Sequence, residues 1–169
     1  IGAKTVFLDQ RMSANVSFFF GSYDDIQVTS IQDLGDLDGD GVPELVRITQ
    51  NAAQATTKGL EFELLARPID GMVVQGSVGV VDARYDNFPV AISDYDGNEI
   101  NRSGESFAGI PQLQTFVSLQ HSFPVRVAGA ESLDGYITPR LEWAYTSEIY
   151  YSGRELLQGR QGGVNLLNG

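Results

Sequence analysis

The sequence predicts an all-β fold, an antiparallel meander of long strands. Apolar and polar residues alternate with a period of two over several segments, as a pleated strand requires and an amphipathic helix does not allow. Turn residues separate these segments, and the 19 glycines, 7 tyrosines and 9 phenylalanines among 169 residues favour strands and turns over helices. The length is that of one domain.

The first two strands are predicted at Ile1 to Leu8 and from Met12 onward, with a tight turn at Asp9 to Arg11 between them. The second strand has one apolar and one polar face. Its apolar face carries Met12, Ala14, Val16, Phe18 and Phe20, and its polar face carries Ser13, Asn15 and Ser17. Two strands joined by so short a turn form a hairpin.

The next two strands, residues 47–67 and 72–85, repeat the pattern across the compact turn Pro68 to Gly71. In the first of them Leu60, Phe62, Leu64 and Ala66 lie opposite Glu61, Glu63 and Arg67, and in the second Val74, Val78 and Val80 lie opposite Gln75, Ser77 and Gly79. Two further strands are predicted at residues 112–123 and 136–147. Their apolar sets are Leu113, Val117 and Leu119, then Ile137, Leu141, Trp143 and Tyr145.

The connections alternate in length: short at residues 9–11, long at 31–44, short at 68–71, long at 86–111 and moderate at 124–135. This rhythm is typical of a transmembrane β-barrel, whose apolar side chains face lipid and whose polar side chains face the interior. The open alternative is a soluble sandwich, in which the apolar face is simply buried. In a barrel, the interior would be lined by Glu61, Glu63, Gln75, Arg140 and Glu142, and ligand contacts would lie there and on the long loops.

Four phrases in order carry a resemblance to a known family: "IGAKTVFLDQRMSANVSFFFGSYDDIQV", "NAAQATTKGLEFELLARPIDGMVVQGSVGVVDARYDNF", "GESFAGIPQLQTFVSLQHSF" and "DGYITPRLEWAYTSEIYY". The series resembles the C-terminal part of the β-barrel of TonB-dependent outer-membrane receptors. The resemblance implies a bacterial outer-membrane location, contact with outer-membrane lipid, and import of an iron-siderophore complex or another scarce small-molecule nutrient or metal chelate. Energy would come from the TonB complex acting through a plug domain. No enzyme activity is implied.

Neither the plug domain nor the closing strand of that family is recognisable in residues 1–169. The predicted strands are only part of the roughly 22 strands of such barrels. An open sheet leaves backbone groups unpaired at its edges and cannot lie alone in lipid. We therefore expect residues 1–169 to be the C-terminal portion of a receptor barrel, an excised piece of a longer chain.

The stretch "DLDGDGVPE" places carboxylates at its first, third, fifth and ninth positions, with glycines at the sharp turns. Hard cations such as Ca²⁺ require several such oxygens around one point. The stretch resembles the calcium loop of integrin-type propeller repeats and lacks the twelfth-position Glu of an EF-hand, because Arg47 stands there. The predicted ligands, in an extracellular loop at residues 31–44, are Asp36, Asp38, Asp40, Glu44 and, through its carbonyl, Val42. The alternative is a solvated acidic loop without metal.

Charge and composition exclude other functions. A net charge of −11 argues against binding nucleic acid, and cysteine is absent. No catalytic set occurs: His121 is predicted to be a structural residue at a strand end, and Asp82 and Arg84 to form a local ion pair. A second acidic turn, Asp94 to Glu99, has too few ligands for a metal site. The alternative function is a soluble extracellular calcium-binding adhesion or binding module.

Overall fold

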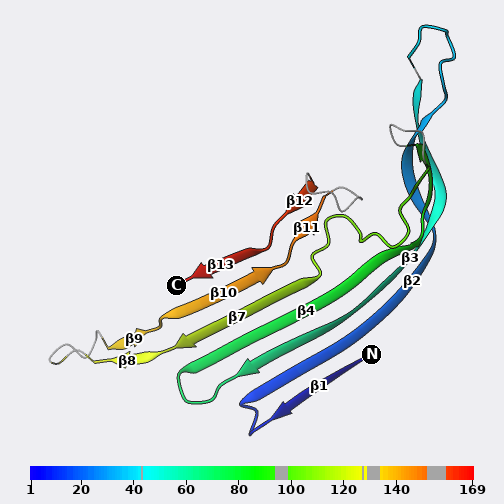
Figure 1. The fold of residues 1–169 in the computed structure, drawn as a ribbon. Helices are drawn as coiled ribbons and strands as arrows, with labels where there is room; N and C mark the ends of the chain where they lie inside the picture. The colour runs from blue at the N-terminus through cyan, green and yellow to red at the C-terminus, as the bar shows by residue number, and fades with distance from the viewer. Residues whose placement is uncertain (43, 94–98, 127, 129–133, 152–158) are drawn as a thin grey trace.

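A computed structural model describes residues 1–42, 44–93, 99–126, 128, 134–151 and 159–169. Its main element is one antiparallel sheet of seven strands in the order β1-β2-β3-β4-β7-β10-β13 (Figure 1). The predicted antiparallel meander is therefore confirmed. The strands of this sheet are β1 (Gly2–Phe7), β2 (Met12–Asp33), β3 (Leu45–Ala66), β4 (Met72–Asn87), β7 (Leu113–His121), β10 (Arg140–Thr146) and β13 (Val164–Asn168).

Three small hairpins lie in the connections of the main sheet. They are β5 (Pro89–Ser93) with β6 (Glu99–Asn101), β8 (Phe123–Val125) with β9 (Gly135–Ile137), and β11 (Ile149–Tyr150) with β12 (Arg160–Gln161). The β8–β9 hairpin prolongs β7 and β10. At the junction the His121 amide donates to the Pro139 carbonyl at 3.2 Å, and the Ser122 and Thr138 hydroxyls lie 3.0 Å apart. Pro139 has no N–H, which explains why the strand pairing is interrupted there.

Both tight turns have the backbone conformations that short hairpins demand. In the first, Leu8, Asp9 and Gln10 all have positive φ, and the Arg11 amide donates to the Leu8 carbonyl at 3.0 Å. In the second, Gly71 has a φ of 80°, and a Cβ there would lie 2.7 Å from the Ser122 carbonyl oxygen. Glycine is therefore required at this position on both grounds.

The β2 and β3 strands are the longest, with 22 residues each. At about 3.3 Å per residue such a strand is about 70 Å long, whereas about 9–11 residues cross a membrane. Past the pair of Gln54 with Asn87, β2 and β3 continue as a two-stranded arm, residues 26–53, that ends in the acidic loop (Figure 1). The loop itself is shorter than predicted, because β2 runs to Asp33 and β3 begins at Leu45.

Few hydrophobic side chains are buried in the described part of the chain. They are Ala53, Ala55, Ala66, Ala83 and Phe88. Ala53 and Phe88 pack with Ile26 and Tyr85 at the base of the arm. The large sheet thus has no core of its own, and its stability depends on what covers its faces.

Candidate functional site

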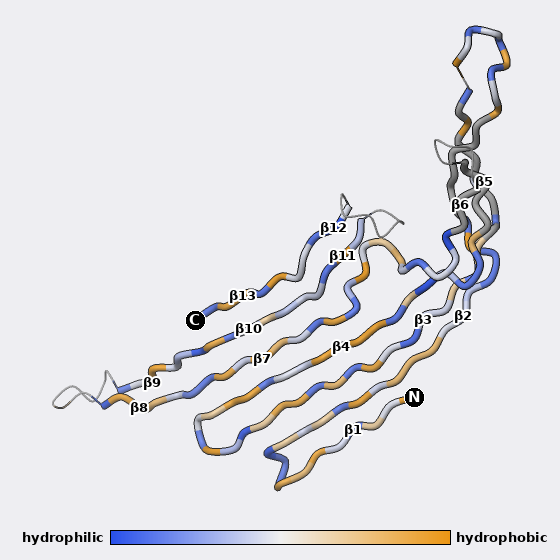
Figure 2. The backbone as a smooth tube through the Cα atoms, viewed as in Figure 1, coloured by the Kyte–Doolittle hydropathy of each residue, from blue (hydrophilic) through white to orange (hydrophobic). Residues whose placement is uncertain are grey.

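Hydrophobic and hydrophilic residues alternate along the strands of the main sheet (Figure 2). The strand register places most of the apolar side chains on one side of the sheet, the apolar face. Its members are Met12, Ala14, Val16, Phe18, Phe20, Leu60, Phe62, Leu64, Val74, Val78, Val80, Leu113, Val117, Leu119, Leu141, Trp143 and Leu167. They are open to the surroundings: Phe18 is 52% exposed, Leu119 42% and Leu167 69%. Within the described residues no second layer covers this face, so the sandwich alternative does not fit. An uncovered apolar area of this size marks contact with another apolar medium.

The residues of the apolar face form a band across the strands, the apolar band. Residues that pair directly from strand to strand form rows across the sheet, and the band runs obliquely to these rows. At the end of the strands that leads to the long loops, the long-loop end, the last apolar residue of the band on β2 is Phe20. On β13 the last one is Leu167, which lies in the same row as Ala14 of β2 and therefore further from the long loops than Phe20. At the opposite end of the strands, next to the short turns, the band begins at Met12 on β2. On β8 it begins further out, at Phe123, which lies beyond the row of Met12. Barrel strands tilt by about 35–45°, so a flat slab of lipid touches each successive strand at a shifted position. The shift therefore fits strands that cross a bilayer.

The polarity of the two sides reverses just beyond the band at the long-loop end. On the side of the apolar face the next residues are Thr56, Lys58, Asp82, Arg84 and Asp86. On the other side the next residues are Thr57 and a mostly apolar set, Ala53, Ala55, Ala83 and Tyr85. The Tyr85 ring packs at 4.6 Å against both Phe88 and Phe107. Such a reversal is expected where strands leave hydrocarbon and enter water.

The opposite side of the band, the polar face, holds two neighbouring carboxylates on β3. The Ser17 hydroxyl donates to Glu61 Oε2 and the Asn15 amide donates to Glu63 Oε2, both at 2.9 Å. The sequence predicted that Glu61 and Glu63 share this face, and the register confirms it. It did not predict their partners, because that requires knowing which residue of β2 lies opposite which residue of β3.

Gln75, Arg140 and Glu142 also lie on the polar face, as predicted. Arg140 Nη2 and Glu142 Oε1 form an ion pair of 2.5 Å. A shallow hollow of about 350 Å³ lies on the same face, next to a second of about 370 Å³. The first is lined among others by Glu61, Glu63, Ser77, Gln114, Phe116 and Thr146. This surface offers hydrogen-bonding groups to water, to a solute or to another protein segment.

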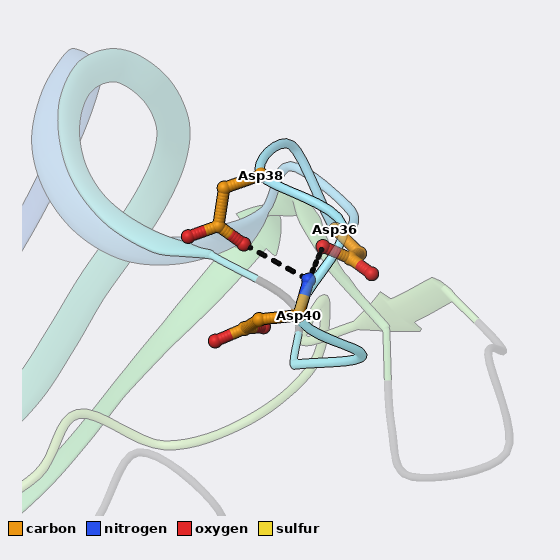
Figure 3. A group of neighbouring side chains, drawn as sticks. All are labelled: Asp36, Asp38 and Asp40. Carbon is orange, nitrogen blue, oxygen red and sulfur yellow. Dashed lines mark hydrogen bonds between the residues drawn. The ribbon is translucent and has the colours of Figure 1, made fainter.

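The acidic loop brings the three aspartates together. One carboxylate oxygen from each of Asp36, Asp38 and Asp40 lies within 4.8 Å of the others, and all three side chains are exposed (Figure 3). Backbone amides hold them in place: Asp36 accepts from Gly39 at 2.6 Å, and Asp40 accepts from Val42 at 2.8 Å. This arrangement could hold a cation through three carboxylates.

The other two predicted ligands have different contacts. Glu44 Oε2 accepts the Leu37 amide at 2.7 Å, and the Glu44 backbone closes the loop through Leu34 and Gly35 at 2.9 and 3.0 Å. Val42 contributes its amide to Asp40, and a role for its carbonyl stays a prediction.

The remaining predicted residues are placed as follows. Arg84 Nε and Asp82 Oδ1 form the predicted ion pair at 2.6 Å. His121 lies at the strand end with its ring edge-to-face against Phe123 at 4.3 Å, which fits a structural role. The acidic turn Asp94 to Glu99 lies outside the described residues, except for Glu99.

A single sheet with a tilted apolar band on one side and hydrogen-bonding groups on the other defines a class of protein, the transmembrane β-barrel. In the described ranges no helix is long and apolar enough to span a membrane. Over residues 1–168 the chain matches the family described as TonB dependent receptor-like, beta-barrel. The chain belongs to this family, and the predicted resemblance is confirmed.

Among solved structures with a similar fold is the crystal structure of the ferric yersiniabactin uptake receptor FyuA from Yersinia pestis. The identity is 19% and the TM-score 0.65, and the match covers 98% of this chain and 20% of that chain. The present sequence thus spans a fifth of the FyuA chain. The family is that of TonB-dependent receptor barrels, and the similar structure shares its fold.

Proposed function

We propose that residues 1–169 form the C-terminal portion of the barrel wall of a receptor that imports a scarce nutrient across the bacterial outer membrane. The observation that carries the proposal is the tilted apolar band, because lipid on one side and water on the other explain both faces of the sheet. The arm and the loops between β4 and β7 would lie outside the cell. Glu61, Glu63 and Arg140 would line the interior.

The proposed cargo is an iron-siderophore complex or another metal chelate or small-molecule nutrient. Membership of the TonB-dependent receptor family and the fold shared with a ferric yersiniabactin uptake receptor support this class of cargo. Import would draw on the TonB complex, which would act on a plug domain inside the barrel. The polar face, with its paired carboxylates and shallow hollows, is suited to contact such a domain.

Membrane fractionation tests the location. The full-length protein that carries this chain should sediment with outer membranes and need detergent for extraction. Recovery in buffer without detergent would contradict the proposal and favour the soluble calcium-binding module. Uptake of radiolabelled ferric chelates should then require both this receptor and the TonB complex, and uptake that persists without TonB would remove the energy-coupling step.

The acidic loop supports a second proposal, a Ca²⁺ site at its tip. Three carboxylates within 4.8 Å repel one another unless a cation neutralises them, and the site would stiffen the loop rather than catalyse a reaction. Extracellular sites of this kind bind with dissociation constants of about 0.1–1 mM. Calorimetric titration of the full-length protein should show binding that Asp38→Ala and Asp40→Ala each weaken. Absence of binding in the unsubstituted protein would rule out the site.

A further inference from the structure

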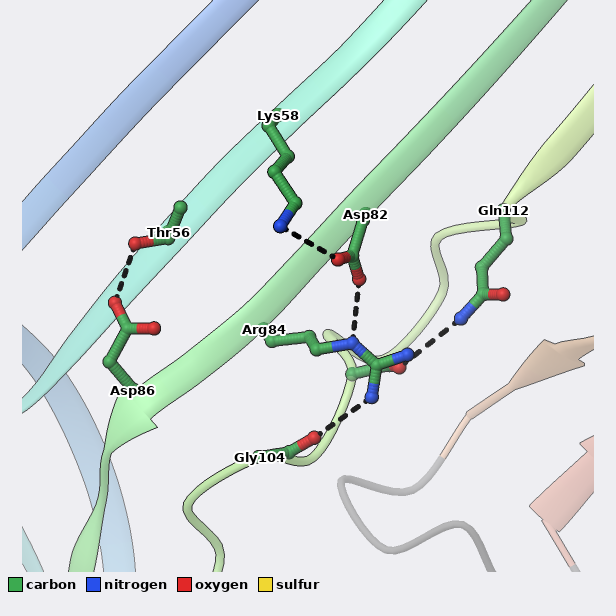
Figure 4. A network of polar contacts seen from close by, with 8 residues as sticks. Thr56, Lys58, Asp82, Arg84, Asp86, Gly104 and Gln112 are labelled. Carbon is green, nitrogen blue, oxygen red and sulfur yellow. Dashed lines mark hydrogen bonds and ion pairs between the residues drawn. The ribbon is translucent and has the colours of Figure 1, made fainter.

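A cluster of polar side chains borders the apolar face at its long-loop end. This rim cluster consists of Thr56, Lys58, Asp82, Arg84 and Asp86 (Figure 4). Asp82 bridges two cations, with Oδ2 3.6 Å from Lys58 Nζ and Oδ1 2.6 Å from Arg84 Nε. Arg84 Nη1 also donates to the Gly104 carbonyl at 3.0 Å. The Thr56 hydroxyl donates to Asp86 at 2.6 Å.

The strand register fixes the side on which the rim cluster lies. Lys58 pairs with both Phe20 and Asp82, and Leu60 and Val80 lie two residues further along the same side. On β3 and β4, Lys58 and Asp82 therefore occupy the first positions past the apolar band, level with Phe20 at its end on β2. In a bilayer this row lies at the depth of the lipid headgroups, where long cationic side chains place their charged ends.

The cluster presents mainly hydrogen-bond donors to its surroundings. Both carboxylates have partners inside the cluster, because Asp82 contacts the two cations and Asp86 contacts Thr56. An ammonium group has three N–H donors and a guanidinium has five, so Lys58 and Arg84 keep donors beyond the contacts described. Their side chains are 55% and 43% exposed.

We propose that Lys58 and Arg84 bind a headgroup phosphate of an anionic lipid in the leaflet that borders the long loops. The ligand would be a phosphorylated membrane lipid rather than a free anion, because the site continues directly from the lipid-facing band. Arg84 would present its guanidinium edge to two phosphate oxygens, and Lys58 would add a point charge. The inference rests on the membrane location proposed above.

The test measures binding of diphosphoryl lipid A to the full-length receptor in detergent by native mass spectrometry. Lys58→Ala and Arg84→Ala should each weaken binding about fivefold, since one cation near an anionic lipid surface is worth about 1 kcal/mol. Lys58→Arg should bind like the unsubstituted receptor. Lys4→Ala removes the same charge from the opposite face, because Lys4 pairs with Asn15, and it should have no effect. Equal losses for Lys4→Ala and Lys58→Ala would overturn the proposal.

Asp82→Asn separates lipid binding from a purely structural ion pair. If Lys58 and Arg84 serve only to form ion pairs with Asp82, breaking these pairs from either side should have the same effect. Asp82→Asn should then weaken the binding of lipid A as much as Arg84→Ala does, and this result would overturn the proposal. If they hold phosphate, binding should stay equal or rise, because a nearby negative charge has been removed. Displacement of lipid A by inorganic phosphate would also overturn it.

The membrane fractionation described above keeps the two proposals distinguishable. A receptor that partitions with membranes but whose variants bind lipid A unchanged overturns this inference alone. A receptor recovered without detergent overturns the proposed function as well.

Discussion

Gly59 lies beneath the ring of Phe19, its direct partner across β2 and β3 on the polar face. A Cβ at Gly59 would lie 2.8 Å from Phe19 Cε1. It would lie closer still to Phe19 Cζ and to the Val80 carbonyl oxygen. Because the backbone oxygen cannot move aside easily, Gly59→Ala should destabilise the receptor by about 1–3 kcal/mol. The measurement is the thermal unfolding midpoint of the full-length protein in detergent.

Gly79 provides the matched control, since it also lies on the polar face and a Cβ there meets nothing within 4 Å. Gly79→Ala should be neutral or stabilise by up to about 1 kcal/mol. Equal midpoints for the two variants would show that Phe19 does not cover Gly59.

The first tight turn, between β1 and β2, contains non-glycine residues with positive φ. Gln10 has a φ of 65°, a left-handed conformation that costs an L-residue about 1–2 kcal/mol and glycine almost nothing. Gln10→Gly should therefore raise the free energy of unfolding by about 0.5 kcal/mol or more, once the greater freedom of glycine in the unfolded chain is subtracted. The unfolding midpoint should rise slightly as a result. Ser13→Gly, within β2, should lower it. A fall for both would mean that the turn is not strained.

Contacts between side chains were predictable from the sequence where the two partners lie close together in the chain. The converging aspartates of the acidic loop and the pair of Asp82 with Arg84 are two residues apart, so strand and turn geometry alone bring them together. The pairs of Ser17 with Glu61 and Asn15 with Glu63 were not predictable. Their partners lie more than 40 positions apart and depend on the register of β2 against β3.

At the scale of elements, alternation predicted every strand of the main sheet except β13. In the first three residues of β13 the alternation runs opposite to that of its neighbours, because Val164 and Leu166 lie on the polar side and Asn165 on the apolar side. Leu167 then lies on the apolar side, in phase with the neighbouring strand. Asn165 is nevertheless satisfied there, because its Oδ1 accepts from Trp143 Nε1 at 3.2 Å. The strands β2 and β3 extend further into the arm than the alternation of residue types predicts. The reason is that the arm pairs through backbone groups, which any residue type supplies.

The two faces of β4 give a direct test of the face assignment. Val78→Lys places a charge on the apolar face, and Ser77→Lys places it on the polar face one residue away. A lysine in the middle of the lipid-facing band costs about 2–4 kcal/mol, whereas a lysine in the aqueous interior costs little. Val78→Lys should therefore lower the unfolding midpoint and the yield of membrane-inserted receptor, measured by heat-modifiability on gels, while Ser77→Lys should not. The reverse order would exchange the two faces.

At the scale of the whole molecule, the sheet is a wall without a core, with β1 and β13 as its edges. Each edge strand presents a row of unpaired backbone groups, and the apolar face remains uncovered within the described residues. A soluble domain of 169 residues buries large side chains between layers, whereas the buried hydrophobic residues described here are mostly alanines. The conformation is therefore one that neighbouring strands and lipid must maintain.

It follows that residues 1–169 expressed alone should not fold to a stable monomer in buffer. Open strand edges and an uncovered apolar face favour edge-to-edge association, so size-exclusion chromatography should show large aggregates, and hydrogen exchange should find no protected monomeric sheet. Within the full-length receptor in detergent, the same amides of β2, β3 and β4 should be strongly protected, because each strand has neighbours on both sides. A well-protected monomer of the isolated residues in buffer would contradict the barrel-wall assignment, since only a sheet that covers its own apolar face could persist in water.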